Sequence, residues 1–245
     1  MEALGIDVGG SGVKAAPVEL ATGKRVSKRK RIATPQPSTP AAVYQVLDQL
    51  IDHFDWHGPI GCAFPSVVCN GIVLTAANID DSWIGRDVES ELEARFGEEV
   101  TVLNDADAAG IAENLFGAAK ELTGTVLLLT LGTGIGSALF TDGVLVPNTE
   151  FGHLEFQGHE AERYAAARVV NKEQLTERDW ALRLNEYLAY VERILTPDHI
   201  ILGGGISKNF DRYADLLDTN ASIRPARFRN RAGIIGAALA TGAVA

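Results

Sequence analysis

Cysteine is scarce in this sequence, with only Cys62 and Cys69 among 245 residues. Their spacing fits no zinc-binding motif, and a reducing compartment, the default for such a chain, argues against a disulfide between them. We therefore expect two small, partly buried side chains, not a metal site or a cross-link.

Long hydrophobic runs are also absent. No apolar stretch is long enough and sufficiently free of charge to span a membrane. The N-terminal residues read as a strand, without the basic segment and apolar stretch of a secretory signal. We therefore expect a cytoplasmic location and no membrane partner.

Positive charge is in deficit, with 22 Lys and Arg against 32 Asp and Glu and a net charge of −10. This balance excludes a general nucleic-acid coat, so no nucleic-acid partner is expected. The basic residues nevertheless gather in two stretches, which comprise Lys24, Arg25, Lys28, Arg29, Lys30 and Arg31, and then Arg224, Arg227, Arg229 and Arg231. A charged run is usually a solvated face. In an acidic protein, however, a local basic patch can also steer an anionic substrate.

Glycine, by contrast, is plentiful, and three glycine-rich turns lie within residues 4–14, 129–138 and 200–208. Each follows a short apolar run that reads as a buried strand, so its backbone N–H groups can converge on an anion. A single turn of this kind serves ordinary chain reversal equally well. Ser11 and Thr133 add hydroxyls to two of the turns, and Asp7 adds a carboxylate to the first. Together they indicate two sides of a phosphate site and hence phosphoryl transfer.

Strands and helices alternate along the chain, which predicts an α/β fold. The apolar patterns predict strands at 3–8, 12–20, 25–33, 60–64, 71–75, 100–103, 125–131, 135–140 and 199–202. They predict helices from about 40 to 54, near 87–96, from 104 to 115, over parts of 160–195 and at 232–242. In the 160–195 region, Leu182, Tyr187, Val191 and Leu195 are expected to be buried.

Six motifs follow one another over nearly the whole chain. They are Asp7-Val8-Gly9-Gly10-Ser11-Gly12-Val13-Lys14, Asn104-Asp105, Leu131-Gly132-Thr133-Gly134-Ile135-Gly136, Glu150-Phe151-Gly152-His153, Glu162-Arg163-Tyr164-Ala165 and Gly203-Gly204-Gly205-Ile206. In this order they resemble the first phosphate loop, catalytic segment, second phosphate loop, sugar motif, later sugar-binding Glu and nucleoside-side turn of the ROK sugar kinases. That family belongs to the hexokinase/actin superfamily.

The resemblance implies a two-domain hexokinase/actin-like fold, with a mixed sheet in each domain and a cleft between them. The small domain is expected over 1–105, with the C-terminal helix at 232–245 returning to it, and the large domain over 106–231. A homodimer is also implied.

Asp105 is the candidate catalytic base, because a sugar hydroxyl must lose its proton during transfer. An Asp at this point can equally cap the following helix. The residues alone leave both roles open, and the resemblance favours the base; Asp107 is interpreted as a capping or supporting residue. The expected sugar-binding residues, which can hydrogen-bond to several hydroxyls, are Asn78, Asn104, Asp105, Glu150, His153 and Glu162.

The expected phosphate-binding residues are Asp7, Gly9, Gly10, Ser11, Gly12, Lys14, Thr130, Gly132, Thr133 and Gly134, with Gly203, Gly204 and Gly205 on the nucleotide side. Asp7 is expected to orient Mg²⁺ through water, since this ion keeps several waters and uses few carboxylates. Strand-end hydrogen bonding is the alternative for Asp7, and a solvent-facing side chain the alternative for Lys14.

The segment between His153 and Glu162 lacks the cysteine-rich zinc loop of most family members. We therefore expect no zinc. The missing loop, together with Ala63-Phe64-Pro65-Ser66-Val67-Val68 and Ser82-Trp83-Ile84-Gly85, resembles the polyphosphate glucokinase branch. That branch implies glucose as acceptor and polyphosphate, ATP or both as donor, with mannose as a further acceptor. An ATP-only hexokinase is one alternative. A sugar sensor is another, although the sequence is expected to lack the N-terminal DNA-binding domain of such sensors because it opens on the first phosphate-loop strand.

Overall fold

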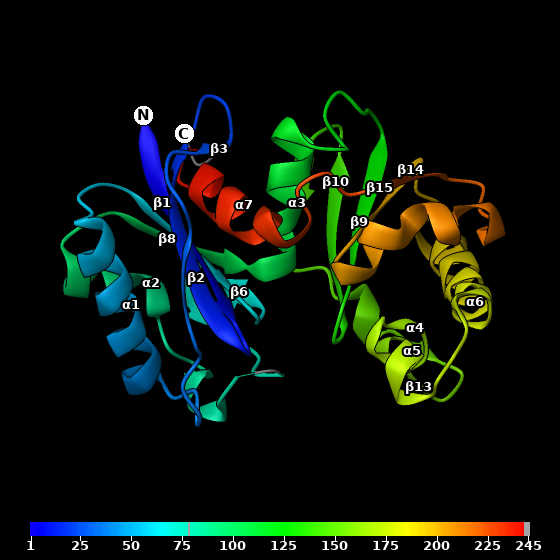
Figure 1. The fold of residues 1–245 in the computed structure, drawn as a ribbon, viewed down its shortest axis with the longest axis horizontal. Helices are drawn as coiled ribbons and strands as arrows, with labels where there is room; N and C mark the ends of the chain where they lie inside the picture. The colour runs from blue at the N-terminus through cyan, green and yellow to red at the C-terminus, as the bar shows by residue number, and fades with distance from the viewer. Residues whose placement is uncertain (78, 243–245) are drawn as a thin grey trace. The chain divides into compact units, whose positions relative to one another are not determined.

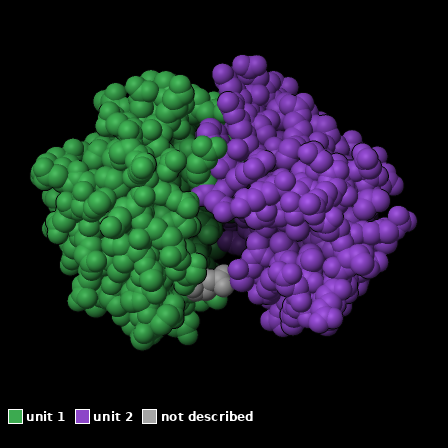
Figure 2. All heavy atoms as spheres, viewed as in Figure 1, with its two compact units in different colours: residues 1–116, 231–245 green, residues 117–230 purple. Residues whose placement is uncertain are grey.

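The computed structural model describes residues 1–77 and 79–242, and the chain forms two compact units. Unit 1 comprises residues 1–116 and the segment from 231 onward, and unit 2 comprises residues 117–230; Figure 2 colours them separately. The sequence placed the first boundary after residue 105. The helix that follows residue 104 instead belongs with unit 1, because it packs against the C-terminal helix. Asn78, one of the expected sugar ligands, lies outside the described residues.

Unit 1 is built on a six-stranded mixed sheet in the order β3-β2-β1-β5-β8, with β4 also paired to β2. Its strands are β1 (Glu2–Gly9), β2 (Gly12–Glu19), β3 (Lys24–Arg25), β4 (Lys30–Ile32), β5 (Ile60–Phe64) and β8 (Val100–Asn104). A small ribbon and four helical segments complete the part of the unit before residue 117: β6 (Val68–Cys69), β7 (Ile72–Val73), α1 (Pro40–Phe54), η1 (Asp81–Trp83), α2 (Val88–Phe96) and α3 (Asp105–Phe116). The strand β1 is antiparallel to β2 and parallel to β5.

Side chains of β1 alternate between two different environments. Leu4, Ile6 and Val8 are buried in a core that includes Val43 and Leu47 of α1. The intervening residues face α7 (Ala232–Ala240), which packs against β1, β5 and α3. Figure 1 shows α7 and α3 side by side next to this sheet.

The helix α7 approaches α3 very closely because both carry small residues. A Cβ atom added at Gly236 would overlap the carbonyl oxygen of Ala108 in α3. Every residue of α7 except Gly233 is buried. The glycine- and alanine-rich composition of α7 is therefore required by backbone contact between two helices.

Unit 2 is built on a five-stranded mixed sheet in the order β11-β10-β9-β14-β15. Its strands are β9 (Thr125–Leu131), β10 (Ile135–Thr141), β11 (Val144–Val146), β14 (His199–Gly203) and β15 (Ser222–Pro225). The remaining elements are η2 (Phe151–His153), β12 (Glu155–Phe156), β13 (His159–Glu160), α4 (Glu162–Ala165), α5 (Arg168–Lys172), α6 (Glu177–Leu195), η3 (Gly205–Arg212) and η4 (Ala214–Leu216), with η5 (Arg229–Arg231) at the junction of the units. Two mixed sheets with helices confirm the α/β class predicted from the sequence.

The long helix α6 shows one error in the predicted core. Tyr187 and Val191 are fully buried as expected, whereas Leu182 is 49% exposed and Leu195 is half-buried. The buried stripe of α6 runs through Trp180 and Leu184 at a helical spacing. Leu182 lies midway between these two along the helix, so it points to the opposite side.

The two cysteines differ from each other in burial, so the expectation that both are partly buried is wrong. Cys62 on β5 is fully buried and Cys69 is exposed, and both are free thiols. Burial raises the pKa of the Cys62 thiol. Among the described residues, no helix has the length and apolar character needed to cross a membrane.

We predict that Gly236→Ala destabilises the protein by about 3 kcal/mol, near the upper end of overpacking effects, because a backbone oxygen cannot move aside. Gly242→Ala is the matched control, since its new Cβ would lie 3.5 Å from Leu20 Cδ1, an ordinary contact. Urea unfolding of both variants measures the difference. Equal midpoints would contradict the close approach of α7 to α3.

Candidate functional site

The first glycine turn joins β1 to β2 in unit 1, and three side chains from the following segment bind its carbonyl groups. Thr34 Oγ1 donates to the oxygen of Gly9, Gln36 Nε2 to the oxygen of Gly10 at 3.5 Å, and Arg31 Nη2 to the oxygen of Ser11 at 2.5 Å. Carbonyl oxygens carry partial negative charge and would repel a phosphate. These donors therefore fix the turn and hydrogen-bond the carbonyl oxygens that would otherwise repel a phosphate.

Asp7 and Lys14 form an ion pair beside this turn. They are register partners on β1 and β2, and Lys14 Nζ lies 2.9 Å from Asp7 Oδ2. The Lys14 side chain is 24% exposed and the Asp7 side chain 17%. This hydrogen bond near the end of β1 agrees with the strand-end alternative for Asp7, whereas the Lys14 side chain is directed at Asp7 and not simply at solvent. The pair places one carboxylate and one cation at the start of the turn.

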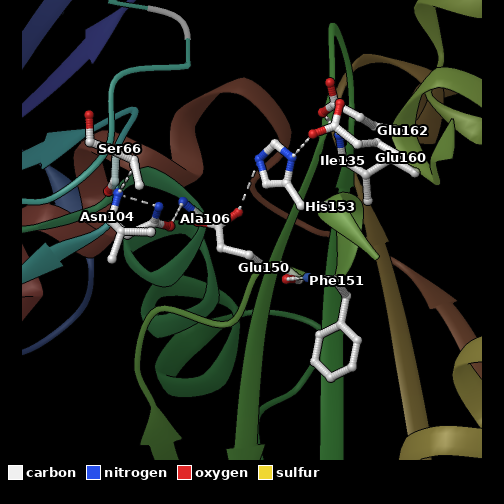
Figure 3. Close-up of polar contacts among 12 residues, drawn as sticks. Ser66, Asn104, Ala106, Ile135, Glu150, Phe151, His153, Glu160 and Glu162 are labelled. Carbon is white, nitrogen blue, oxygen red and sulfur yellow. Dashed lines mark hydrogen bonds and ion pairs between the residues drawn. The ribbon is translucent and has the colours of Figure 1, made fainter. Parts of the chain in front are cut away.

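Asn104 ends β8, and its side chain caps α3. Its Oδ1 accepts hydrogen bonds from the backbone N–H groups of Ala106 at 2.8 Å and Asp107 at 3.1 Å, while Nδ2 donates to the oxygen of Ser66 at 3.1 Å (Figure 3). The helix cap is therefore provided by Asn104. Asp105, the first residue of α3, is not required for that task.

Strand register brings the unit 1 residues to one edge of the sheet. Asp7 pairs with Ala63 of β5, and Ala63 pairs with Leu103 of β8, so Asn104 and Asp105 lie just past the same edge. These parallel strands all end there, two strand spacings or roughly 10 Å apart. The two predicted motifs of unit 1 therefore share one end of its sheet.

The second glycine turn, between β9 and β10 in unit 2, is closed by its own backbone. The N–H of Gly132 donates to the oxygen of Gly134 at 3.0 Å, and the N–H of Arg168 donates to the oxygen of Gly132 at 3.0 Å. Thr133 is exposed at the tip. The N–H of Gly132 is thus already bound in this structure, which the sequence did not indicate.

Glu162 lies directly on this second turn. Its Oε2 accepts from the N–H of Ile135 at 3.3 Å, and its Oε1 accepts from Arg168 Nη2 at 3.2 Å. A Cβ at Gly134 would overlap Glu162 Oε2, so the turn needs glycine here to admit the carboxylate. A predicted sugar ligand and a predicted phosphate loop are therefore in contact within unit 2.

The segment from Glu150 to His153 is fixed to β10. Ser137 Oγ donates to the oxygen of Thr149 at 2.5 Å and accepts from the N–H of Phe151 at 2.9 Å. A Cβ at Gly152 would overlap the oxygen of Ile135, which explains the glycine that precedes His153. The segment consequently holds both Glu150 and His153 beside the second turn.

His153 lies between two carboxylates, as Figure 3 shows. Its Nδ1 is 3.0 Å from Glu160 Oε1, and its Nε2 is 3.8 Å from Glu150 Oε2. Burial, followed by a smaller effect of the Glu162 charge, raises the pKa of Glu150, and the His153 ring opposes that rise. The hydrogen bond from His153 lowers the pKa of Glu160. The pKa values of the two carboxyls on either side of the ring are thus shifted in opposite directions.

The third glycine turn follows β14. Gly203 ends the strand beside Thr130 of β9, and Ser207 Oγ donates to the oxygen of Gly204 at 2.8 Å. In unit 2 the third turn and Thr130 therefore lie at the same end of the sheet as the second turn.

Four supporting residues escaped the sequence analysis. Glu160 and Arg168 hold His153 and Glu162, and Thr34 holds the first turn. Ser66 is 3% exposed, and its Oγ has no hydrogen-bond partner within the described part of the chain. Only Ser66 could have been found from the sequence, because it lies in the Ala63–Val68 segment that resembles the polyphosphate glucokinase branch. Glu160, Arg168 and Thr34 are separated from their partners by turns whose geometry the sequence does not show.

Comparison with known proteins shows the family of this chain. The ROK family model matches residues 3–173. This chain belongs to the ROK family. It is 48% identical over 238 residues to the polyphosphate glucokinase of Mycobacterium tuberculosis (strain ATCC 25618 / H37Rv), covering 97% of this chain and 90% of that protein. The polyphosphate glucokinase of Mycobacterium leprae (strain TN) is 47% identical over 97% of this chain and 74% of its own length.

Among solved structures, the inorganic polyphosphate/ATP-glucomannokinase from Arthrobacter sp. strain KM matches with a TM-score of 0.94 and 43% identity, covering 100% of this chain and 99% of that one. The ROK match includes the first two glycine turns, Asn104-Asp105 and the Glu150–Glu162 segment. The third turn, at Gly203–Gly205, lies beyond it but within the span shared with the mycobacterial relatives.

We predict that Glu150→Gln raises the free energy of unfolding of this ROK protein at pH 7.5 but not at pH 4. Below the ordinary carboxyl pKa of 4.5, folded and unfolded chains both hold the proton, so wild type and variant agree. As the pH rises through the raised folded pKa, the wild type must ionise a carboxyl that burial disfavours and loses stability. The exposed Glu155→Gln serves as control, and a gain that is independent of pH would contradict this explanation.

Proposed function

We propose that this protein is a sugar kinase that transfers the terminal phosphoryl group of inorganic polyphosphate, of ATP or of both to the 6-hydroxyl of glucose. The observation that carries the proposal is the start of α3, where Asn104 caps the helix and Asp105 lies at the same end of the sheet as Asp7 and the first glycine turn. The names of the mycobacterial and Arthrobacter relatives support the choice of donors and acceptor. The Arthrobacter name also supports mannose as a second acceptor.

Asp105 is proposed as the general base. A carboxylate beside the 6-hydroxyl orients that oxygen and accepts its proton as the bond to phosphorus forms. The Asn104 side chain already makes three hydrogen bonds within the protein, which leaves one Nδ2 hydrogen for a sugar oxygen. Asn104 therefore acts chiefly by fixing the position of Asp105.

Glu150, His153 and Glu162 are proposed to bind the sugar hydroxyls. Nδ1 of the His153 ring is held by Glu160, so Nε2 is the ring atom proposed to contact a sugar hydroxyl. The 3.8 Å between Nε2 and Glu150 Oε2 is too long for a direct hydrogen bond, so one hydroxyl can contact both groups. A site that hydrogen-bonds several hydroxyls rejects analogues lacking them, because its polar groups are then left unpaired.

The phosphate chain is proposed to bind the first and second glycine turns, with Thr130, Thr133 and Ser11 as hydroxyl donors and Gly203–Gly205 on the nucleotide side. Asp7 offers a hard oxygen ligand, which fits Mg²⁺ held largely by water and phosphate oxygens. No group of three or more His, Cys, Asp or Glu side chains that could hold a metal ion is found in the described ranges. Bound Mg²⁺ would neutralise charge on the donor phosphates.

A coupled assay with glucose, run separately with ATP and with long-chain polyphosphate, tests the proposal. Formation of glucose 6-phosphate with polyphosphate is the expected result. Activity with ATP alone would support the hexokinase alternative, and no transfer with either donor despite glucose binding would support a sensor. The homodimer and the cytoplasmic location stay predictions, and light scattering of the purified protein measures the first.

We predict that Asp105→Asn lowers kcat by about 10²–10⁴, the usual contribution of a positioned base. The substitution conserves size, so the variant should fold and bind glucose with an affinity close to that of the wild type. Stopped assays and glucose titration by calorimetry measure the two effects. Turnover near that of the wild type would reject Asp105 and direct attention to Asp107.

We predict that activity requires Mg²⁺ and that the purified protein carries no structural zinc. Thiolate ligands of the kind found in structural zinc sites are missing between His153 and Glu162. Chelation followed by Mg²⁺ addition should abolish and restore turnover. Elemental analysis that finds one tightly held zinc per chain would show that this segment has been misinterpreted.

A further inference from the structure

The first basic stretch forms the outer edge of the unit 1 sheet. The strand β4 pairs with the first half of β2 through Arg31 and Lys14, and β3 pairs with its second half through Arg25 and Val18. Register partners point to the same face of a sheet. Arg31 and Arg25 therefore share the face that carries Lys14 and Asp7, which is also the face covered by α7, because Gly233 of that helix abuts Asp7.

This edge begins at the first glycine turn. Arg31 donates to the oxygen of Ser11, and a Cβ at Gly12 would lie 2.6 Å from Arg31 Nη2. The guanidinium thus lies flat on the turn itself. From Lys14 to Val18 the edge extends four residues, or roughly 14 Å, away from the turn.

The cations along this edge have no carboxylate partners. None of the six basic residues from Lys24 to Arg31 forms an ion pair within the part of the chain that the structure describes, whereas Arg86 and Arg95 of the same unit each bind a carboxylate at 2.6 Å or less. Positive charge is therefore concentrated in this short stretch, although the net charge of the whole protein is −10. An uncompensated row of this kind attracts an extended anion.

Three arginines of unit 1 converge beside β3. The pKa of the Arg25 guanidinium is lowered, first by burial and then by the positive charges of Arg231 and Arg29. Arg231 comes from the second basic stretch and directly precedes α7. The fold therefore brings positive charges from two distant parts of the sequence close to one another.

We propose that Arg25, Arg29 and Arg31 form a polyanion-binding row that holds the phosphate units of inorganic polyphosphate beyond the unit being transferred. The inference rests on the proposed function and names the element that favours a long donor. ATP has only two further phosphates behind the unit that is transferred, and a nucleoside follows them, so ATP offers no long phosphate chain to occupy the row. Arg29 and Arg31 are exposed and Arg25 is half-buried, so the contacts of the row remain open to screening by salt.

The second basic stretch is the comparator. Arg224 lies on β15 and Arg229 in η5, both exposed. Across the described residues, neither donates a hydrogen bond to a glycine turn. The double variant Arg224→Gln/Arg229→Gln therefore removes the same charge as Arg25→Gln/Arg29→Gln from another exposed surface. Arg31 is left intact in both variants because it supports the first turn.

The experiment compares the two double variants with the wild type at low salt, using tripolyphosphate, long-chain polyphosphate and ATP as donors. Loss of two exposed charge contacts should raise the KM for long-chain polyphosphate roughly three- to tenfold in Arg25→Gln/Arg29→Gln. The KM for tripolyphosphate and for ATP should change less than twofold, as should all values for the comparator. Raising the salt concentration should weaken long-chain use in the wild type more than in this variant.

Direct binding separates this inference from the proposed function. Calorimetric titration of long-chain polyphosphate into each protein without glucose measures the row independently of turnover. Weaker binding only in Arg25→Gln/Arg29→Gln supports the row even if no transfer is detected, in which case the proposed donor fails alone. Polyphosphate-dependent transfer with equal KM and equal affinity in both variants would overturn the row and leave the proposed kinase intact.

Discussion

The close approach of α7 to the sheet of unit 1 is the contact on which much of that unit depends. Added Cβ atoms at Gly5 and Gly61 would overlap carbonyl oxygens of Ile234 and Ala237, and one at Gly236 would overlap α3. The helix thus lies backbone against backbone on β1, β5 and α3 at once. Because Gly233 also abuts Asp7, the last helix of the chain fixes the surroundings of the first glycine turn.

Parallel strand ends concentrate the candidate chemistry in each unit. In unit 1, β1, β5 and β8 deliver Asp7, Ser66 and Asn104-Asp105 to one edge of the sheet. In unit 2, β9 and β14 deliver the second and third glycine turns to one edge. This is the usual place for ligands in α/β sheets, since helix starts and loop N–H groups gather there.

Polar side chains that each make two or more hydrogen bonds hold these groups in place. Asn104 makes three hydrogen bonds, Glu162 two and Ser137 two or more. A half-satisfied network in a buried position is costly, so such networks select one arrangement. The six basic residues from Lys24 to Arg31 are the contrasting case, because none of them forms an ion pair with another described residue.

Local patterns in the sequence determined the α/β class, most strand and helix positions and the order of the motifs. Apolar periodicity and glycine-rich strand ends depend on neighbours within a few residues, which is why they are legible in the chain itself. The same local reasoning placed Leu182 in the core and treated the two cysteines alike, and it failed there because burial depends on which face meets a partner.

Tertiary structure alone decided which residue caps α3, that Glu162 rests on Gly134, that Glu160 orients His153 and that Arg31 covers Gly12. It also placed Arg231 of the second basic stretch near Arg25 of the first, although more than two hundred residues of sequence lie between them. Each of these relations joins residues through strand register or helix packing. Contacts of this kind are set by the three-dimensional path of the backbone, and residue identity along the chain does not encode that path in any short segment.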